Sequence, residues 1–99
     1  MELSEQLLVE LKRFLNEEGK LTIFPSKKQN KMLVLLYLST KFQPEVIYTE
    51  KEVNEIIDQY HTFQDKWLLR RELINQGFLS RLPDGSQYWM TKEQPEVFH

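Results

Sequence analysis

The chain has 99 residues, of which 40% are hydrophobic and 12% aromatic, enough apolar material for a single core. Its net charge of −2 argues against a dedicated nucleic-acid coat protein. It contains no cysteine, which excludes disulfides, thiolate metal sites and cysteine nucleophiles. The longest apolar run, residues 32–38, is too short to span a bilayer, and the acidic N-terminal segment is unlike a signal peptide. We therefore expect one soluble, cytoplasmic domain with no membrane partner.

The first segment, residues 1–19, predicts an amphipathic helix that is capped by Ser4 and ended by Gly19. Its large apolar residues recur with helical spacing on one face: Leu3, Leu7, Leu8, Leu11, Phe14 and Leu15. Such a stripe covers either the protein's own core or the surface of a second subunit.

The next segment, residues 20–61, predicts two helices that alternate with short strand-like runs at 21–24 and 46–48. Ser26 is expected to cap a helix that runs to about Lys41 and is buried on most sides, because residues 32–38 are apolar nearly all round. Thr49 and Glu52 form a capping box. The short helix that follows carries its apolar residues at amphipathic spacing: Val53, Ile56, Ile57 and Tyr60.

The last segment predicts a helix and a β-hairpin. The helix follows a break at residues 61–63, runs to about Gln76 and is stopped by Gly77. Two alternating runs, 78–82 and 87–91, flank Pro83-Asp84-Gly85-Ser86, a sequence typical of a hairpin turn. The hairpin residues expected to close the core are Phe78, Leu79, Tyr88 and Trp89.

This order of elements predicts an α+β fold that is mainly helical. We expect a winged helix-turn-helix with an extra N-terminal helix and a C-terminal β-hairpin as the wing. In this arrangement residues 1–19 are the added helix, residues 20–91 the winged-helix-like domain, and residues 92–99 a polar tail.

Several segments of the chain are similar to one bacterial family. These segments are Leu21–Pro25, Tyr48–Asn54, Leu69–Ile74, Gly77–Arg81 and Asp84–Trp89. Together, over about residues 20–90, they resemble the family known as domain of unknown function 2087. The resemblance implies a winged-helix-like fold and an association with transcriptional regulators, in which the module often follows a separate DNA-binding domain. It implies no catalytic or ligand-binding residues.

The sequence offers little for catalysis. His61 and His99 lie far from other plausible metal ligands, and Gly19, Gly77 and Gly85 stand too far apart to form a phosphate-binding loop. The serines occupy cap, strand and turn positions with no adjacent base. We therefore predict that the protein is not an enzyme and uses no cofactor or metal.

In a helix-turn-helix protein that binds DNA, the last helix would enter the major groove. Helical spacing predicts an inner arc of Phe63, Trp67, Leu69, Leu73 and Ile74. It predicts an outer arc of Gln64, Asp65, Leu68, Arg71, Glu72, Asn75 and Gln76. Gln, Arg and Asn suit base edges and phosphates, but the two acids repel a phosphate backbone. The alternative, which we favour, is that the outer arc faces solvent or a protein partner.

Basic residues elsewhere give further candidate contacts. Lys27, Lys28 and Lys31 cluster at the start of a helix, where positive charge opposes the helix dipole; they contact phosphate or form a solvated face. Arg81 lies near a hairpin tip that is acidic to neutral. Arg70 falls in the inner arc, so we expect it to pack its stem on the core or to pair with an acid of another helix; the alternative is a clamp on phosphate.

These observations predict a small bacterial protein of the transcription-regulator type, with weak contact to duplex DNA or docking onto another regulator. The alternative is a protein-interaction module that does not bind DNA. In either case we favour a homodimer, because regulators of this architecture commonly pair to match two-fold DNA sites. Its predicted seam consists of Leu3, Leu7, Leu11 and Phe14.

Overall fold

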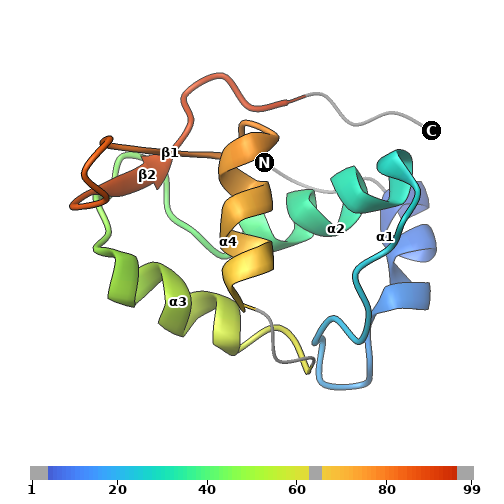
Figure 1. Ribbon diagram of the computed structural model, residues 1–99. Coiled ribbons are helices and arrows are strands. Elements are labelled where there is room, and N and C mark those ends of the chain that lie inside the picture. Colours follow the sequence, from blue (N-terminus) through green and yellow to red (C-terminus); the bar gives the residue numbers. More distant parts are fainter. Residues whose placement is uncertain (1–4, 63–65, 96–99) are drawn as a thin grey trace.

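The computed structural model describes residues 5–62 and 66–95, and this part of the chain is an α+β, mainly helical fold. Its α-helices are α1 Glu5–Leu11, α2 Lys28–Ser39, α3 Glu50–Asp58 and α4 Lys66–Asn75. A 3-10 helix, η1 Lys12–Phe14, continues α1, and the strands β1 Leu79–Arg81 and β2 Tyr88–Met90 form a hairpin. In Figure 1, α4 crosses α2, with α3 and the hairpin on one side and α1 on the other.

The N-terminal helix is shorter than predicted. Leu15 is already extended and bridges Leu21, so the chain leaves helical geometry well before Gly19. The cause is the Asn16 side chain, whose Oδ1 accepts hydrogen bonds from the backbone N–H groups of Glu18 and Lys20, both at 3.0 Å. Gly19, at φ +78°, therefore serves this turn and does not end a helix. The predicted Ser4 cap lies outside the described residues.

The apolar stripe predicted as a dimer seam packs within its own subunit. Leu11 is fully buried, Phe14 is 7% exposed, and Leu7 packs against the same core. Leu3 lies outside the described residues. Leu11 and Phe14 of the predicted seam are thus covered by the protein's own core, and the homodimer itself stays a prediction.

Helix α2 is the central element of the core, and every side chain from Leu33 to Ser39 is buried. The prediction of a nearly all-apolar, enclosed helix is confirmed. The Ser26 cap is wrong, because the N-cap residue is Lys27 and no side chain caps it. The helix ends at Ser39, and the N–H of Thr40 donates to the carbonyl oxygens of Leu36 and Tyr37.

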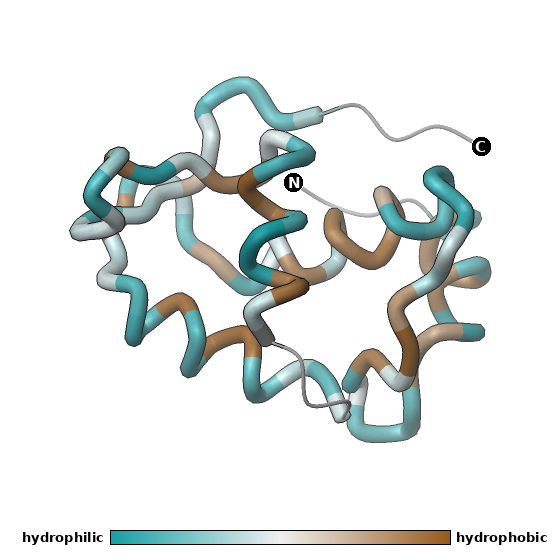
Figure 2. Tube along the Cα trace, in the orientation of Figure 1, coloured by the Kyte–Doolittle hydropathy of each residue, from teal (hydrophilic) through white to brown (hydrophobic). Residues whose placement is uncertain are grey.

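Helix α3 begins at the predicted capping box. The N–H of Thr49 donates to Glu52 Oε1 at 2.8 Å, and the N–H of Glu52 donates to Thr49 Oγ1 at 3.1 Å. Val53 and Ile57 are fully buried. Figure 2 shows the hydrophobic positions of α3 on its side toward the interior.

Helix α4 ends as predicted at Gly77, which adopts φ +88°. The N–H of Gly77 donates to the Ile74 carbonyl at 3.1 Å, and the N–H of Phe78 donates to the Leu73 carbonyl at 2.9 Å. This pair of hydrogen bonds is the Schellman motif. Leu73 and Phe78, which the motif brings together, are both fully buried.

The hairpin is confirmed, with Leu79 paired to Met90 and Arg81 to Tyr88. At its tip Asp84 Oδ1 accepts hydrogen bonds from the Ser86 N–H and Oγ, which lower the Asp84 carboxyl pKa. A single residue of the α2–α3 connection joins the other side of β2. Tyr48 exchanges two backbone hydrogen bonds with Tyr88, at 2.7 and 2.8 Å.

Three of the four hairpin residues predicted to close the core do so. Phe78, Leu79 and Tyr88 are at most 2% exposed. Trp89 is only half-buried and lines a surface hollow, so its assignment to the core is wrong. Successive side chains of a strand point to opposite faces, and Tyr88 already points inward.

Candidate functional site

One residue of α4 that was predicted to face the core is exposed instead. Trp67 was expected to face the core, but it is 57% exposed. The inner face is centred on Leu69 and Leu73, both fully buried. Trp67 lies two positions before Leu69, about 200° around the helix, and therefore points away from the core. Leu68, predicted to face outward, is half-buried.

A hollow of about 350 Å³ lies between α4, the start of α3 and the hairpin. It is lined by Glu50, Trp67, Arg70, Arg71, Ile74, Asn75, Arg81 and Tyr88. We call it the arginine hollow. Its α4 members recur three and four positions apart, so they form one stripe along the helix. Among the described residues that line it, three arginines face one carboxylate, although the chain as a whole has a net charge of −2.

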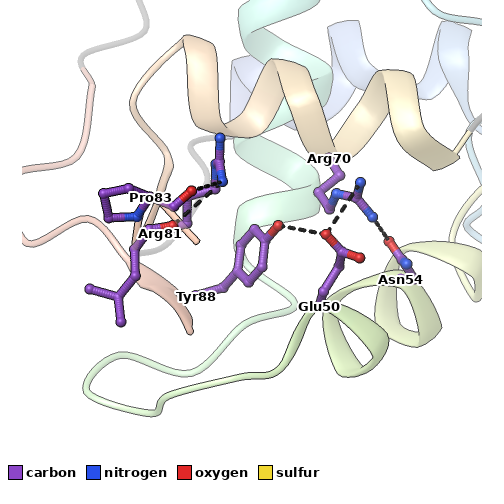
Figure 3. Close-up of polar contacts among 7 residues, drawn as sticks. Glu50, Asn54, Arg70, Arg81, Pro83 and Tyr88 are labelled. Atoms are coloured by element: carbon purple, nitrogen blue, oxygen red, sulfur yellow. Dashed lines mark hydrogen bonds and ion pairs between the residues drawn. The ribbon is translucent and has the colours of Figure 1, made fainter. Parts of the chain in front are cut away.

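Hydrogen bonds and an ion pair connect Arg70, Glu50 and Tyr88 at one end of the arginine hollow, which we call its inner end (Figure 3). Arg70 Nη1 donates to Asn54 Oδ1 at 2.7 Å, and Arg70 Nη2 lies 3.6 Å from Glu50 Oε1. The Tyr88 hydroxyl donates to the same Glu50 oxygen at 3.0 Å. Arg70 thus pairs with an acid of another helix, which confirms the structural interpretation of this residue.

The surroundings of Tyr88 keep its hydroxyl protonated. Burial raises the pKa of Tyr88 most, and the hydrogen bond to Glu50 and the negative charge of Glu50 raise it further. The raised pKa therefore extends the role of Tyr88 as a hydrogen-bond donor to Glu50 into more alkaline pH. Because Glu50 Oε1 also faces Arg70, this carboxylate links β2, α3 and α4.

Three of the predicted contact residues meet at the arginine hollow. Arg71 and Asn75 are exposed on α4, and Arg81 is exposed at the end of β1. Arg81 Nη1 donates to the carbonyl oxygens of Leu82 and Pro83 at 3.4 and 3.3 Å (Figure 3). These bonds are long, so they hold the guanidinium only weakly over the hairpin turn.

The predicted lysine cluster lies elsewhere. Lys27 and Lys28 are exposed, and Lys31 Nζ lies 5.8 Å from the centre of the Phe24 ring. Arg13 joins this region by donating to Asn30 Oδ1 at 3.3 Å. Helix α2 begins beside α1, away from the hairpin (Figure 1), so these cations do not line the arginine hollow. Of the other two candidates, Gln64 lies outside the described residues and Leu68 does not line the hollow.

Trp67, Glu50 and Tyr88 line the hollow but were not among the contact residues predicted from the sequence. Trp67 could have been found from helical spacing, because a face centred on Leu69 and Leu73 leaves Trp67 beside Arg71. Glu50 and Tyr88 come from separate elements that only the folded chain brings together.

A second hollow, of about 630 Å³, lies between residues 44–47 and the outer side of β2. Its apolar lining includes Ile47, which is 61% exposed, and Trp89. Within residues 5–62 and 66–95, no three His, Asp or Glu side chains are grouped to hold a metal ion. No helix of this part of the chain is long and apolar enough to cross a membrane.

Residues 20–90 match the profile of a family described as "Uncharacterized protein conserved in bacteria (DUF2087)". No curated protein and no solved structure matches the chain with significance. The matched segment covers α2, α3, α4 and the hairpin, and it therefore includes the whole arginine hollow. The chain belongs to the DUF2087 family.

Proposed function

We propose that the chain is a winged-helix protein of the transcription-regulator type, which binds duplex DNA through α4 and the hairpin. The order of elements supports the fold: α2, the Tyr48 bridge, α3, α4 and then the hairpin. Tyr48 pairs with β2 and so adds a strand-like residue between the first two helices of this unit. A tight helix pair followed by a wing is a frame for DNA recognition.

One observation carries the proposal. The exposed stripe of α4 and the end of β1 meet around one positively charged hollow. Arg71 and Arg81 are suited to phosphate oxygens, and Asn75 is suited to a base edge. The lysine cluster of Lys27, Lys28 and Lys31 would supply a second, separate contact to the phosphate backbone.

A salt titration of duplex DNA binding tests the proposal. Binding should weaken linearly on a log–log plot, because each neutralised phosphate releases counterions. Arg71→Ala and Arg81→Ala should each reduce the magnitude of the slope by about 1. Lys92→Ala is the matched control, because Lys92 is exposed but lines the other hollow. Slopes that are the same in all three variants would overturn the proposed interface.

The alternative function is a module that docks onto another regulator. The exposure of Trp67 and Ile47 favours it, because large exposed apolar side chains often mark protein contacts. A docking module would show no salt-dependent binding to duplex DNA. The same titration therefore separates the two functions.

A further inference from the structure

The arginine hollow combines an aromatic platform with positive charge. The Trp67 side chain is 57% exposed, whereas Leu69, two residues later, is fully buried. Arg71 follows Trp67 by one helical turn, so both side chains lie on the same side of α4 and both line the hollow. An exposed indole ring beside a guanidinium provides a stacking surface and an anion contact in one place.

The charges of the hollow match a terminal phosphate. Glu50 Oε1 faces Arg70 and accepts the Tyr88 hydroxyl, so this half-exposed carboxylate already has two partners in the hollow. Arg71 and Arg81 remain as the outer cations, and Arg81 has only long contacts to its own turn. A phosphate monoester carries about −1.5 to −2 charges at neutral pH, which two guanidinium groups balance. A guanidinium group can also donate two parallel hydrogen bonds to a phosphate.

The shape of the hollow limits the size of what it holds. Its volume of about 350 Å³ is at the small end of ligand sites, which hold about 300–1,000 Å³. Gly85 of the hairpin turn lies beside the hollow, and a side chain there would make only ordinary contacts with it. A β-carbon at this residue would lie 3.8 Å from Arg81 Nη1 and 3.9 Å from both Glu50 Oε1 and the Tyr88 hydroxyl. A hollow of this volume can hold one ring system that carries one phosphate group.

We propose that the arginine hollow binds one nucleotide with a terminal phosphate, its base stacked on Trp67 and its phosphate held by Arg71 and Arg81. The nucleotide is either a free nucleoside monophosphate or the 5′-phosphorylated end of a single strand. Asn75 lines the same hollow and offers an amide to the edge of the base. The site shares its surface with the proposed duplex interface but does not require duplex binding.

Fluorescence of the full chain tests this site, because its two tryptophans lie in different hollows. In Trp89→Phe the remaining indole is Trp67, and AMP should quench its emission. In Trp67→Phe the remaining indole is Trp89, and AMP should leave its emission unchanged. Adenosine and inorganic phosphate should each bind at least about tenfold more weakly than AMP, since each lacks one set of contacts.

Substitutions and ligand sources complete the test. In the Trp89→Phe background, Arg71→Gln and Arg81→Gln should each weaken AMP binding about tenfold or more, and Lys92→Gln should not. Tighter binding of a 5′-phosphorylated single strand than of AMP would identify a strand end as the ligand, and the reverse a free nucleotide. The proposed site is overturned if neither AMP nor the 5′-phosphorylated strand quenches Trp67. It is also overturned if the arginine and lysine variants bind AMP with equal affinity.

A duplex titration on the same variants keeps the two proposals distinguishable. Duplex binding without AMP or strand-end binding overturns the nucleotide site alone. Nucleotide binding without duplex binding overturns the proposed function alone.

Discussion

Arg70 shows how a charged residue becomes structural. Its side chain is 17% exposed, and its guanidinium reaches Asn54 and Glu50 on α3. Its neighbour Arg71 lies on the exposed side of the same helix. The two arginines are adjacent in sequence, but a rotation of about 100° separates a helix-to-helix link from an outer surface.

Arg70→Ala should lower the free energy of unfolding by about 1–3 kcal/mol, because the Asn54 amide and the Glu50 carboxylate lose a partly buried donor. Arg71→Ala should change it by no more than about 0.5 kcal/mol, as surface substitutions usually do. Urea unfolding of both variants measures the difference. Equal losses would show that the helical phase of α4 is wrong.

Two tyrosines make the fold sensitive to alkali. Burial raises the pKa of Tyr37 above its ordinary value of 10.0, and Tyr60 raises it further; Tyr88 is raised by burial and by Glu50. Both hydroxyls donate hydrogen bonds, Tyr37 to the Gly19 carbonyl at 2.5 Å and Tyr88 to Glu50. Folding therefore favours the protonated form of both residues.

The contribution of these tyrosines should be fully present below pH 10 and lost as the pH rises through their raised pKa values. We expect the unfolding free energy to fall in this range. The double variant Tyr37→Phe, Tyr88→Phe should show a shallower fall, since its rings cannot ionise. Urea unfolding between pH 8 and pH 11 measures both profiles, and identical slopes contradict the prediction.

At the scale of single elements, the features predicted correctly have causes that lie within a few residues. The Thr49–Glu52 capping box, the Gly77 helix stop and the Pro83–Ser86 turn each satisfy their own backbone groups locally. The errors arose where another group competes. Asn16 accepts hydrogen bonds from the N–H groups of Glu18 and Lys20 and turns the chain before Gly19. Ser26 lies one residue before Lys27, which takes the N-cap position of α2.

Gly77→Ala tests the helix stop. An alanine at φ +88° is strained, so we expect a loss of about 1–2 kcal/mol in the free energy of unfolding. A clash is not the cause, because a β-carbon there would lie 3.6 Å from Pro95 Cγ, an ordinary contact. Gly77→Asn is the control: asparagine tolerates the left-handed region better and should cost less. An alanine as stable as the asparagine would contradict a conformational origin.

At the scale of the whole molecule, tertiary contacts decided what the sequence left open. The N-terminal stripe had two possible partners, and the structure places Leu11 and Phe14 in the same core as α2. The arginine hollow likewise joins Glu50, Arg70, Arg81 and Tyr88 from different elements. Local patterns indicate the surface of α4 but not which residues of α3 and the hairpin meet it. The orientation of Trp67 was missed because its apolar character suggested burial.

Removing residues 1–18 tests the role of this helix in the core. The truncated chain should fail to fold cooperatively at any protein concentration, because it lacks the buried Leu11 and Phe14 side chains. Circular dichroism during urea titration, at protein concentrations a hundredfold apart, measures this. Val9→Ala in the full chain is the mild control, since Val9 is 63% exposed. A truncated chain that unfolds cooperatively with near-native stability would show that the core does not need the N-terminal helix.

Tyr88 connects the hairpin to the rest of the fold in two ways: its backbone hydrogen-bonds to Tyr48, and its hydroxyl donates to Glu50. The hairpin is thus held in place by contacts within the fold itself. A binding segment that becomes ordered only on association loses conformational entropy at that step, which weakens its affinity. A segment that is already ordered in the folded protein avoids this loss. We therefore expect the backbone positions of Arg71 and Arg81 to change little on binding, and only their exposed side chains to adjust.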